Sequence, residues 1–207
     1  GTLLNTLTDL ADAGNRLCRK YGWPTHERQA YRYFVGNGIP KLVERLAPAD
    51  QRTPAVLEEA LADFKRDYGQ HLRDTTAPYP GIPEMLAKLK ANGVQLAVFS
   101  NKADALAKEV VKDYFGTQYF TIVRGQMTGV APKPAAEGTN ALLQALHADP
   151  ASTLYVGDSN VDVETAHNAN LPCCGAVWGF RTREELNAAG AEYLAENSDE
   201  LYDVIMK

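Results

Sequence analysis

Apolar residues recur every three or four positions through the first third of the chain. One such series runs over 7–21 and another over 39–46. This spacing is typical of helices that bury one face. A third helix is predicted to begin at Thr53, because a threonine N-cap followed by Pro54 is a common helix start. The stretch 7–75 is therefore predicted to be helical throughout, and it contains no convincing strand pattern.

After residue 77 the pattern alternates between helix and strand. The predicted elements are helix 83–93, strand 94–100, helix 103–113, strand 119–123, helix 135–146, strand 153–157, helix 160–169 and strand 174–177. Strands that alternate with helices at these lengths indicate parallel βαβ units and an open α/β sheet. Ligands of such sheets bind at the carboxyl ends of the strands. The residues that follow each strand are therefore where chemistry is expected.

Polar residues of suitable types follow these predicted strands. Ser100 and Asn101 follow the first strand, Asp158 follows the strand at 153–157 with Asp162 one helical turn later, and Lys133 lies in a proline-flanked loop. Each has an ordinary alternative: serine and asparagine cap helices, an aspartate near a helix start is favoured by the dipole, and a loop lysine is usually exposed. Their convergence at one sheet edge favours a functional site.

Phosphoryl transfer is the chemistry that needs this combination. Carboxylate oxygens suit Mg²⁺, a hard cation that keeps several waters and binds phosphate. A lysine offsets negative charge on phosphoryl oxygens, and a small hydroxyl holds a remaining oxygen without adding charge. The set lacks one role, because no residue in it is placed to attack phosphorus.

Composition narrows the class of protein. The 207 residues are 45% hydrophobic and carry a net charge of −5, with no lysine- or arginine-rich cluster, so no nucleic-acid partner is expected. No apolar run approaches the roughly 18 residues that span a bilayer, and the start does not read as a signal peptide. Three cysteines make no disulfide framework, which suits a reducing cytosol. We expect a cytoplasmic monomer or homodimer that acts on a small molecule.

Four segments resemble the motifs of haloacid dehalogenase superfamily phosphatases. "GTLLNT" at 1–6 resembles the tail of the first motif, "VFSNK" at 98–102 the second, "APKPAAE" at 131–137 the third and "VGDSNVDVETA" at 156–166 the fourth. The resemblance implies a Rossmann-like α/β core with a parallel sheet and an inserted α-helical cap. It implies the cap at 9–76, the core at 1–8 and 77–207, and Mg²⁺ as cofactor.

The resemblance also implies roles for individual residues. Asp158 would be a Mg²⁺ ligand, Asp162 a supporting acid that orders the metal shell, and Lys133 the charge-balancing catalytic residue. The residues implied to bind phosphate are Thr2, Ser100, Asn101 and Lys133.

Three further segments resemble the phosphoglycolate phosphatase subgroup. They are "FVGNGIPKLVERL" at 34–46, "PYPGIPEMLAKLKANG" at 78–93 and "AVWGFRTREEL" at 176–186. Gly36 and Asn37, just before a predicted helix, could present backbone N–H groups to a substrate carboxylate. An ordinary turn between helices is the alternative.

The family's Asp-x-Asp pair would stand immediately before Gly1. By resemblance its first member is the nucleophile that forms an aspartyl-phosphate and its second the general acid and base. Asp9 and Asp12 cannot replace the pair, because they lie inside the first cap helix. We expect the pair, and a strand leading into it, upstream of Gly1; a chain that truly began at Gly1 would be inactive.

The leading hypothesis is a Mg²⁺-dependent phosphomonoesterase that acts on a small phosphorylated metabolite, with 2-phosphoglycolate as the expected substrate. Alternatives within the superfamily are another hydrolase, including a dehalogenase, or a phosphosugar mutase. Outside enzyme function, a non-catalytic small-molecule-binding relative would fit the absent pair. A receiver-type signalling domain shares the residue types but fits the size and the cap poorly.

Overall fold

A computed structural model describes residues 1–207. Its elements in chain order are β1 (Leu4–Asn5), α1 (Leu7–Tyr21), α2 (Arg28–Phe34), α3 (Ile39–Leu46), the 3₁₀ helix η1 (Ala49–Gln51), α4 (Pro54–His71), β2 (Ala77–Pro78), α5 (Ile82–Ala91), β3 (Leu96–Ala103), α6 (Asp104–Phe115), β4 (Phe120–Gln126), α7 (Glu137–Leu146), the 3₁₀ helix η2 (Pro150–Ser152), β5 (Tyr155–Gly157), α8 (Asn160–Asn168), β6 (Cys173–Ala176), α9 (Arg183–Ala188), β7 (Tyr193–Ala195) and α10 (Ser198–Ile205).

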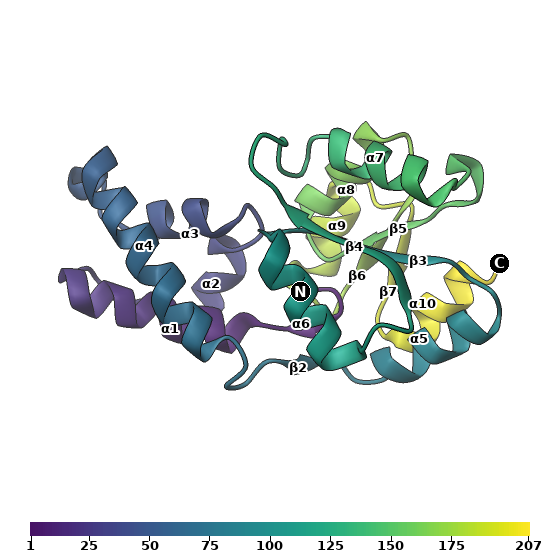
Figure 1. Cartoon of the computed structure of the whole chain (residues 1–207), viewed down its shortest axis with the longest axis horizontal. Helices are drawn as coiled ribbons and strands as arrows, with labels where there is room; N and C mark the ends of the chain where they lie inside the picture. The colour runs from purple at the N-terminus through teal and green to yellow at the C-terminus, as the bar shows by residue number, and fades with distance from the viewer. The chain divides into compact units, whose positions relative to one another are not determined.

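The chain divides into two compact units (Figure 1). Residues 4–77 form a helical unit, and residues 1–3 together with 78–207 form a core unit. The short strands β1 and β2 pair with each other where the chain leaves the core unit and returns to it. The sequence placed the same division at residues 9 and 76, and those exact boundaries stay a prediction.

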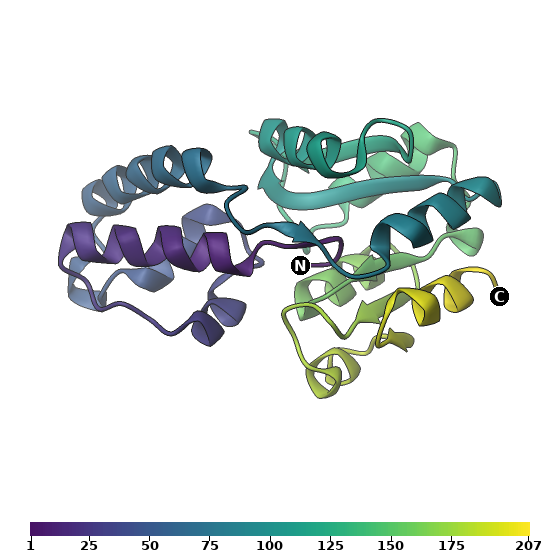
Figure 2. The ribbon, with the colours of Figure 1, turned by 90° about the horizontal axis from the view of Figure 1, so that it is seen from below.

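The helical unit is built on α1 and α4, which lie side by side (Figures 1 and 2). Its interior holds large side chains with almost no exposure, including Tyr31, Phe64 and Tyr68. The helix predicted from Thr53 begins there, and the Thr53 hydroxyl accepts a hydrogen bond from the Val56 N–H. The prediction that residues 7–75 contain helices and no strand is confirmed.

The core unit contains two parallel ladders with helices packed on them. Strand β3 pairs with β4, and β5, β6 and β7 pair in that order. Helices α6 and α7 pack against the first ladder, and α8, α9 and α10 pack against the second. The predicted α/β class is confirmed, but the strands form two separate sheets rather than one. Elements α9, β7 and α10 were not predicted from the sequence.

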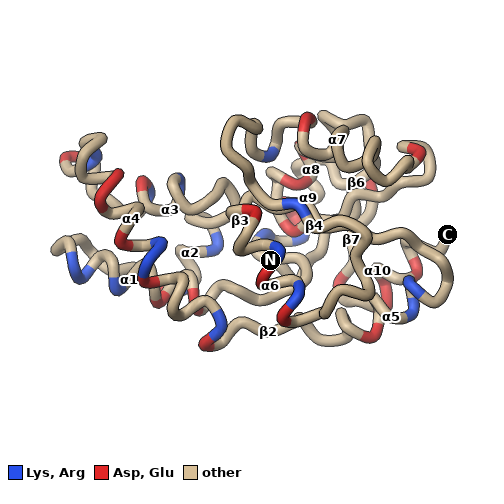
Figure 3. Tube along the Cα trace, viewed as in Figure 1, with Lys and Arg blue, Asp and Glu red and all other residues tan.

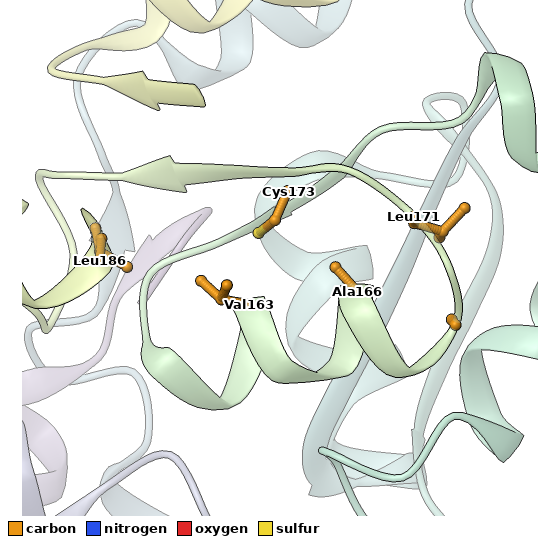
Figure 4. Close-up of a cluster of buried hydrophobic side chains, with 6 residues drawn as sticks. Val163, Ala166, Leu171, Cys173 and Leu186 are labelled. Carbon is orange, nitrogen blue, oxygen red and sulfur yellow. The ribbon is translucent and has the colours of Figure 1, made fainter. Parts of the chain in front are cut away.

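A buried cluster fixes helix α8 on strand β6 (Figure 4). Val163 and Ala166 point from the helix toward Cys173 on the strand, and all three have zero exposure. Leu171 and Leu186 complete the cluster labelled in the figure. Burying aliphatic side chains of this kind stabilises a fold by about 1.5–3 kcal/mol each. Helix α8 therefore presents its first turn from a rigid base.

The first predicted strand is longer than expected. It was predicted to end at residue 100, but β3 continues to Ala103, so Ser100 and Asn101 lie inside the strand. The pairing with β4 is irregular here: Phe99 pairs with Arg124, and the next pair joins Ala103 and Gln126. Two extra residues on one strand form a bulge, which redirects side chains. No helix in the chain combines the length and apolar character needed to span a membrane.

Candidate active site

Asp158 lies directly after β5 and is almost fully buried, with 5% exposure. Its Oδ1 accepts a hydrogen bond from the Thr2 hydroxyl at 2.8 Å, and its Oδ2 accepts one from the Phe180 N–H at 3.0 Å. Its backbone carbonyl accepts from the Arg181 N–H. Each carboxylate oxygen has two lone pairs, so these contacts orient Asp158 and still leave oxygen lone pairs for a ligand.

Asp162 lies in the first turn of α8, at the position from which a side chain can accept hydrogen bonds from the N–H groups at the helix start. Its Oδ2 accepts hydrogen bonds from the Asp158 N–H, the Ser159 N–H and the Ser159 hydroxyl, at 3.2, 3.1 and 2.7 Å. This is a capping box, in which a first-turn acid satisfies N–H groups at the helix start. The carboxylate thus fixes the backbone of the residue that follows β5.

The other oxygen of Asp162 binds Lys133. The distance from Lys133 Nζ to Asp162 Oδ1 is 2.6 Å, and the two side chains are only 11% and 9% exposed. The ammonium also lies 5.8 Å from the centre of the Phe99 ring and 5.9 Å from that of Tyr155. An ammonium near aromatic faces gains cation–π attraction. Lys133 is followed by a cis peptide bond to Pro134.

Lys133 and Asp162 each stabilise the charged form of the other. Burial alone would lower the pKa of Lys133, but Asp162 and Tyr155 outweigh it and raise that pKa above its ordinary value. Burial alone would raise the pKa of Asp162, but Lys133 and the Ser159 hydroxyl lower it below its ordinary value. Burial also raises the pKa of Tyr155 to about 12, against the opposing effect of Lys133. At neutral pH the site therefore holds a cation and an anion together, beside a neutral phenol.

Asn101 connects β3 to the lysine. Its Oδ1 accepts from the Lys133 N–H at 2.8 Å, and its Nδ2 donates to the Lys133 carbonyl at 3.3 Å. The neighbouring Ser100 hydroxyl accepts from the Lys102 N–H at 3.1 Å. The hydroxyl proton of Ser100 does not take part in that bond, so it is available to a phosphoryl oxygen.

The fit of a divalent cation can be judged at Asp158. The backbone comes very close to it: a Cβ on Gly1 would lie 2.0 Å from Asp158 Oδ2, and one on Gly179 would lie 2.1 Å from Asp158 Cβ. Glycine at both positions thus avoids a clash with this carboxylate, and a carboxylate is the preferred ligand type of Mg²⁺. The chain contains no group of three or more His, Cys, Asp or Glu side chains arranged for a metal. Asp158 fits as one ligand, with water and substrate oxygens as the others.

The first residues of the chain are held beside Asp158. The indole N–H of Trp178 donates to the Thr2 carbonyl at 3.0 Å, and the Tyr79 N–H donates to the Leu3 carbonyl at 3.1 Å. The amino nitrogen of Gly1 lies 3.7 Å from Asp158 Oδ1. The segment predicted to belong to the first motif thus reaches the same place as the fourth.

Comparison with known proteins gives the family. Residues 1–176 match the model of the haloacid dehalogenase-like hydrolases. The chain belongs to this family. A phosphoglycolate phosphatase of Vibrio parahaemolyticus is 28% identical over 99% of this chain and 92% of its own. A plasmid-encoded phosphoglycolate phosphatase of Cupriavidus necator is 31% identical over 97% of this chain and 87% of its own.

A solved structure gives the same result for the fold. The crystal structure of a protein provisionally named phosphoglycolate phosphatase, from Lactobacillus delbrueckii subsp. bulgaricus, superimposes with a TM-score of 0.93 at 27% identity. The match covers 99% of this chain and 94% of that one. The predicted resemblance to this family is confirmed.

Among the residues predicted from the haloacid dehalogenase motifs, the structure brings one group together. Thr2 contacts Asp158, Asp162 contacts both Lys133 and the Asp158 backbone, and Asn101 contacts Lys133. Ser100 adjoins this network through the chain. The catalytic, metal-binding and phosphate-binding roles of these residues stay predictions.

Gly36 and Asn37 belong to the helical unit, so their proximity to the core residues stays a prediction. Within that unit the loop is well defined. The Arg45 guanidinium donates to the carbonyls of Tyr33 and Phe34 and to Asn37 Oδ1, at 3.2, 2.9 and 2.9 Å. Gly36 has a φ of 112°, which favours glycine. One arginine side chain thus fixes the shape of the turn before α3.

Three features of the candidate site were not predicted from sequence. Tyr155 lies inside a strand, where an aromatic residue reads as core packing. The contact of Phe180 with Asp158 uses only its backbone, which carries no sequence signal. Asn168 donates from Nδ2 to the Pro134 carbonyl at 2.8 Å, a contact that depends on the packing of α8.

Proposed function

We propose that the protein is a Mg²⁺-dependent phosphatase that hydrolyses a small phosphate monoester, with 2-phosphoglycolate as the substrate. Relatives named phosphoglycolate phosphatase match the chain over nearly its whole length. The observation that carries the proposal is the buried Lys133–Asp162 pair, whose aspartate also binds the backbone N–H of Asp158. A fixed cation and a nearby carboxylate, Asp158, whose bonded oxygens keep lone pairs for a ligand, suit a phosphate and its counter-ion.

In this proposal, each core residue has one task. The ammonium of Lys133 offsets charge on the phosphoryl oxygens and on the attacking carboxylate, and the Ser100 hydroxyl donates to one oxygen. Asp158 would hold the cation, and Mg²⁺ bound there would withdraw negative charge from the phosphoryl group. Asp162 holds Lys133 and the Asp158 backbone in place.

The covalent step uses the aspartate pair expected upstream of Gly1. The first carboxylate attacks phosphorus and forms an aspartyl-phosphate while the ester P–O bond breaks. The second carboxylic acid gives its proton to the leaving oxygen and then takes one from the water that hydrolyses the intermediate. Pre-organised charge of the kind Lys133 supplies contributes about 3–4 kcal/mol to such steps.

The proposed substrate class is supported by the turn that Arg45 fixes before α3. Its N–H groups at Gly36 and Asn37, together with the start of α3, would receive the carboxylate of a small phosphorylated acid. A sugar phosphate lacks that carboxylate and would bind more weakly. We therefore propose a small acidic phosphorylated metabolite as the partner of this site.

Asp158→Asn in the full-length protein tests the proposal. Phosphate release from 2-phosphoglycolate should require Mg²⁺ and stop in excess chelator, and the variant should lose at least about 10²-fold in kcat because an amide is a poor ligand for a hard cation. Asp203→Asn is the control, since Asp203 is an exposed residue of α10 far along the chain from the network. Normal turnover by Asp158→Asn, or turnover unaffected by chelator, would exclude the metal role. A preference for glucose 6-phosphate over 2-phosphoglycolate would exclude the substrate.

A further inference from the structure

The segment around Lys133 is held by asparagine side chains rather than by a strand ladder. Pro132, Lys133 and Pro134 contain a single backbone N–H, because proline has none. That N–H donates to Asn101 Oδ1 at 2.8 Å. The Lys133 carbonyl accepts from Asn101 Nδ2 at 3.3 Å, and the Pro134 carbonyl accepts from Asn168 Nδ2 at 2.8 Å. Two side-chain amides thus satisfy three consecutive polar groups of the backbone.

The two asparagines come from different elements. Asn101 lies in the bulged part of β3, and Asn168 is the last residue of α8. Helix α8 also carries Asp162, which binds the ammonium of the same lysine at 2.6 Å. One helix therefore holds the tip of the Lys133 side chain with its first turn and the adjoining backbone with its last. The buried face of α8 against β6 keeps the two contacts at a fixed separation (Figure 4).

Precise placement of the ammonium matters for the chemistry. Displacing a catalytic group by about 1 Å can reduce a rate by roughly 10²-fold. Lysine has a long flexible side chain, so contact with Asp162 alone would allow the backbone beneath it to shift. Fixing the backbone removes that freedom. Side chains that orient a catalytic group from behind through hydrogen bonds are a common means of achieving this in enzymes.

We propose that Asn101 and Asn168 are positioning residues that act on the reaction through Lys133, and this rests on the proposed function. For Asn101 the proposal adds a role to the predicted phosphate binding, because its amide oxygen and its amide nitrogen are both bonded to the Lys133 backbone. For Asn168 it assigns a role to an exposed side chain that is not part of any family motif described above.

A double-mutant cycle with Lys133 separates positioning from other roles. Asn101→Ala should lower kcat on 2-phosphoglycolate by about 10- to 100-fold and Asn168→Ala by up to about tenfold, with KM within about twofold of wild type. In a Lys133→Met background neither should lower kcat further, because residues that act as one unit are not additive. Asn140→Ala is the control, since Asn140 is an exposed asparagine of α7.

Two outcomes would overturn the proposal. An equal fold-loss in the Lys133→Met background would show that the asparagines act independently of the lysine. A raised KM with unchanged kcat for Asn101→Ala would show a direct substrate contact instead. Asn168→Ala keeps the test usable if Asn101→Ala fails to fold, because the Asn168 side chain is at an exposed helix end.

A second measurement does not depend on activity. Hydrogen exchange of the Lys133 amide, followed by NMR, should be slow in the wild type and at least about tenfold faster in Asn101→Ala, since its acceptor is removed. Unchanged exchange would exclude the Asn101 contact. A wild-type protein that hydrolyses no phosphate ester would overturn the proposed function, and the Lys133 exchange would then decide the backbone contact separately.

Discussion

One ion pair of the core unit and one of the helical unit differ sharply in burial. In the core unit, Lys133 and Asp162 pair with about a tenth of each side chain exposed. In the helical unit, Arg16 and Asp67 pair with about a third of each exposed. Figure 3 shows that acidic and basic positions are interspersed along α1 and α4.

The difference in exposure between the two pairs implies a difference in energetic cost. Burying an ion costs several kcal/mol, so a buried pair persists only where contacts around it are complete. Asp162 has such contacts, with three donors on its second oxygen. Exposed pairs carry no such cost and contribute little. A buried pair such as Lys133 and Asp162 thus indicates a chemical role. Exposed pairs contribute mainly to solubility and to the orientation of helices.

The largest expected effect comes from breaking the buried pair. Lys133→Met should lower the free energy of unfolding by about 3–5 kcal/mol, because it leaves the Asp162 carboxylate buried without its cation. Urea unfolding at pH 7 measures the change. Adding Asp162→Asn should recover part of the loss, since the buried charge is then gone. A loss below about 1 kcal/mol would show that the pair is no more important than a surface pair, and the comparison would fail.

Asp9 of the helical unit is buried without a cation beside it. Its oxygens accept from the N–H groups and hydroxyls of Thr75 and Thr76, with the Thr76 hydroxyl at 2.7 Å and both N–H groups at 2.9 Å. Burial raises the pKa of Asp9, but these four hydrogen bonds outweigh it, so the pKa lies below its ordinary value. Asp9→Asn should therefore destabilise the protein by about 2 kcal/mol at pH 7, because donors lose their acceptors.

The lowered pKa of Asp9 predicts how the destabilisation by Asp9→Asn changes with pH. A carboxylate whose pKa is lower in the folded state contributes stability above its unfolded pKa, near 4, and loses it as the pH falls through the folded value. Wild type should therefore lose its advantage over Asp9→Asn progressively below about pH 4. Urea midpoints from pH 7 to pH 3 test this. A difference that grew as the pH fell would contradict the lowered pKa.

Substitution of Arg45 is expected to have a smaller effect, on substrate specificity. Arg45→Ala removes three hydrogen bonds from the turn at Gly36 and Asn37, and in the proposed function this turn must then be ordered when substrate binds. We expect KM for 2-phosphoglycolate to rise about tenfold, equivalent to about 1.4 kcal/mol, with kcat little changed. Arg28→Ala, at an exposed position of α2, is the control. An equal rise in KM for p-nitrophenyl phosphate, which has no carboxylate, would show that the turn does not select for acids.

Sequence reasoning was strongest where spacing alone decides geometry. Asp158 and Asp162 lie four residues apart at a strand-to-helix junction, and that spacing brings the second carboxylate back to the first residue's backbone. Lys133 could be assigned to the same edge because its loop leads into a helix that follows a parallel strand. The helices of residues 7–75 were readable for the same reason, since their apolar period is local.

Pairings across the fold could not be read in this way. The contact of Asn101 with the Lys133 backbone depends on a bulge in β3 and on a loop more than thirty residues away, and neither leaves a pattern in the chain. The separation of the strands into two ladders is likewise a property of tertiary pairing. Helix α9 did carry a usable signal, because Thr182 and Glu185 form a capping box, but its six residues are too few to show a period.

The smallest effect on stability is expected at the exposed pair of Arg16 and Asp67. Arg16 donates three hydrogen bonds to the Asp67 carboxylate, two from Nε at 3.0 and 2.9 Å and one from Nη2 at 2.8 Å. Even so, Arg16→Met should cost only about 0.5–1 kcal/mol, because water screens both groups and ordering two long side chains offsets the attraction. The cost should shrink further in 1 M salt, where the screening length is about 3 Å. Urea unfolding of Arg16→Met, Asp67→Asn and the double variant measures the coupling. A coupling energy above about 2 kcal/mol that persisted in salt would show that an exposed pair can be as strong as a buried one. Burial would then no longer distinguish Lys133 and Asp162 as the chemical site.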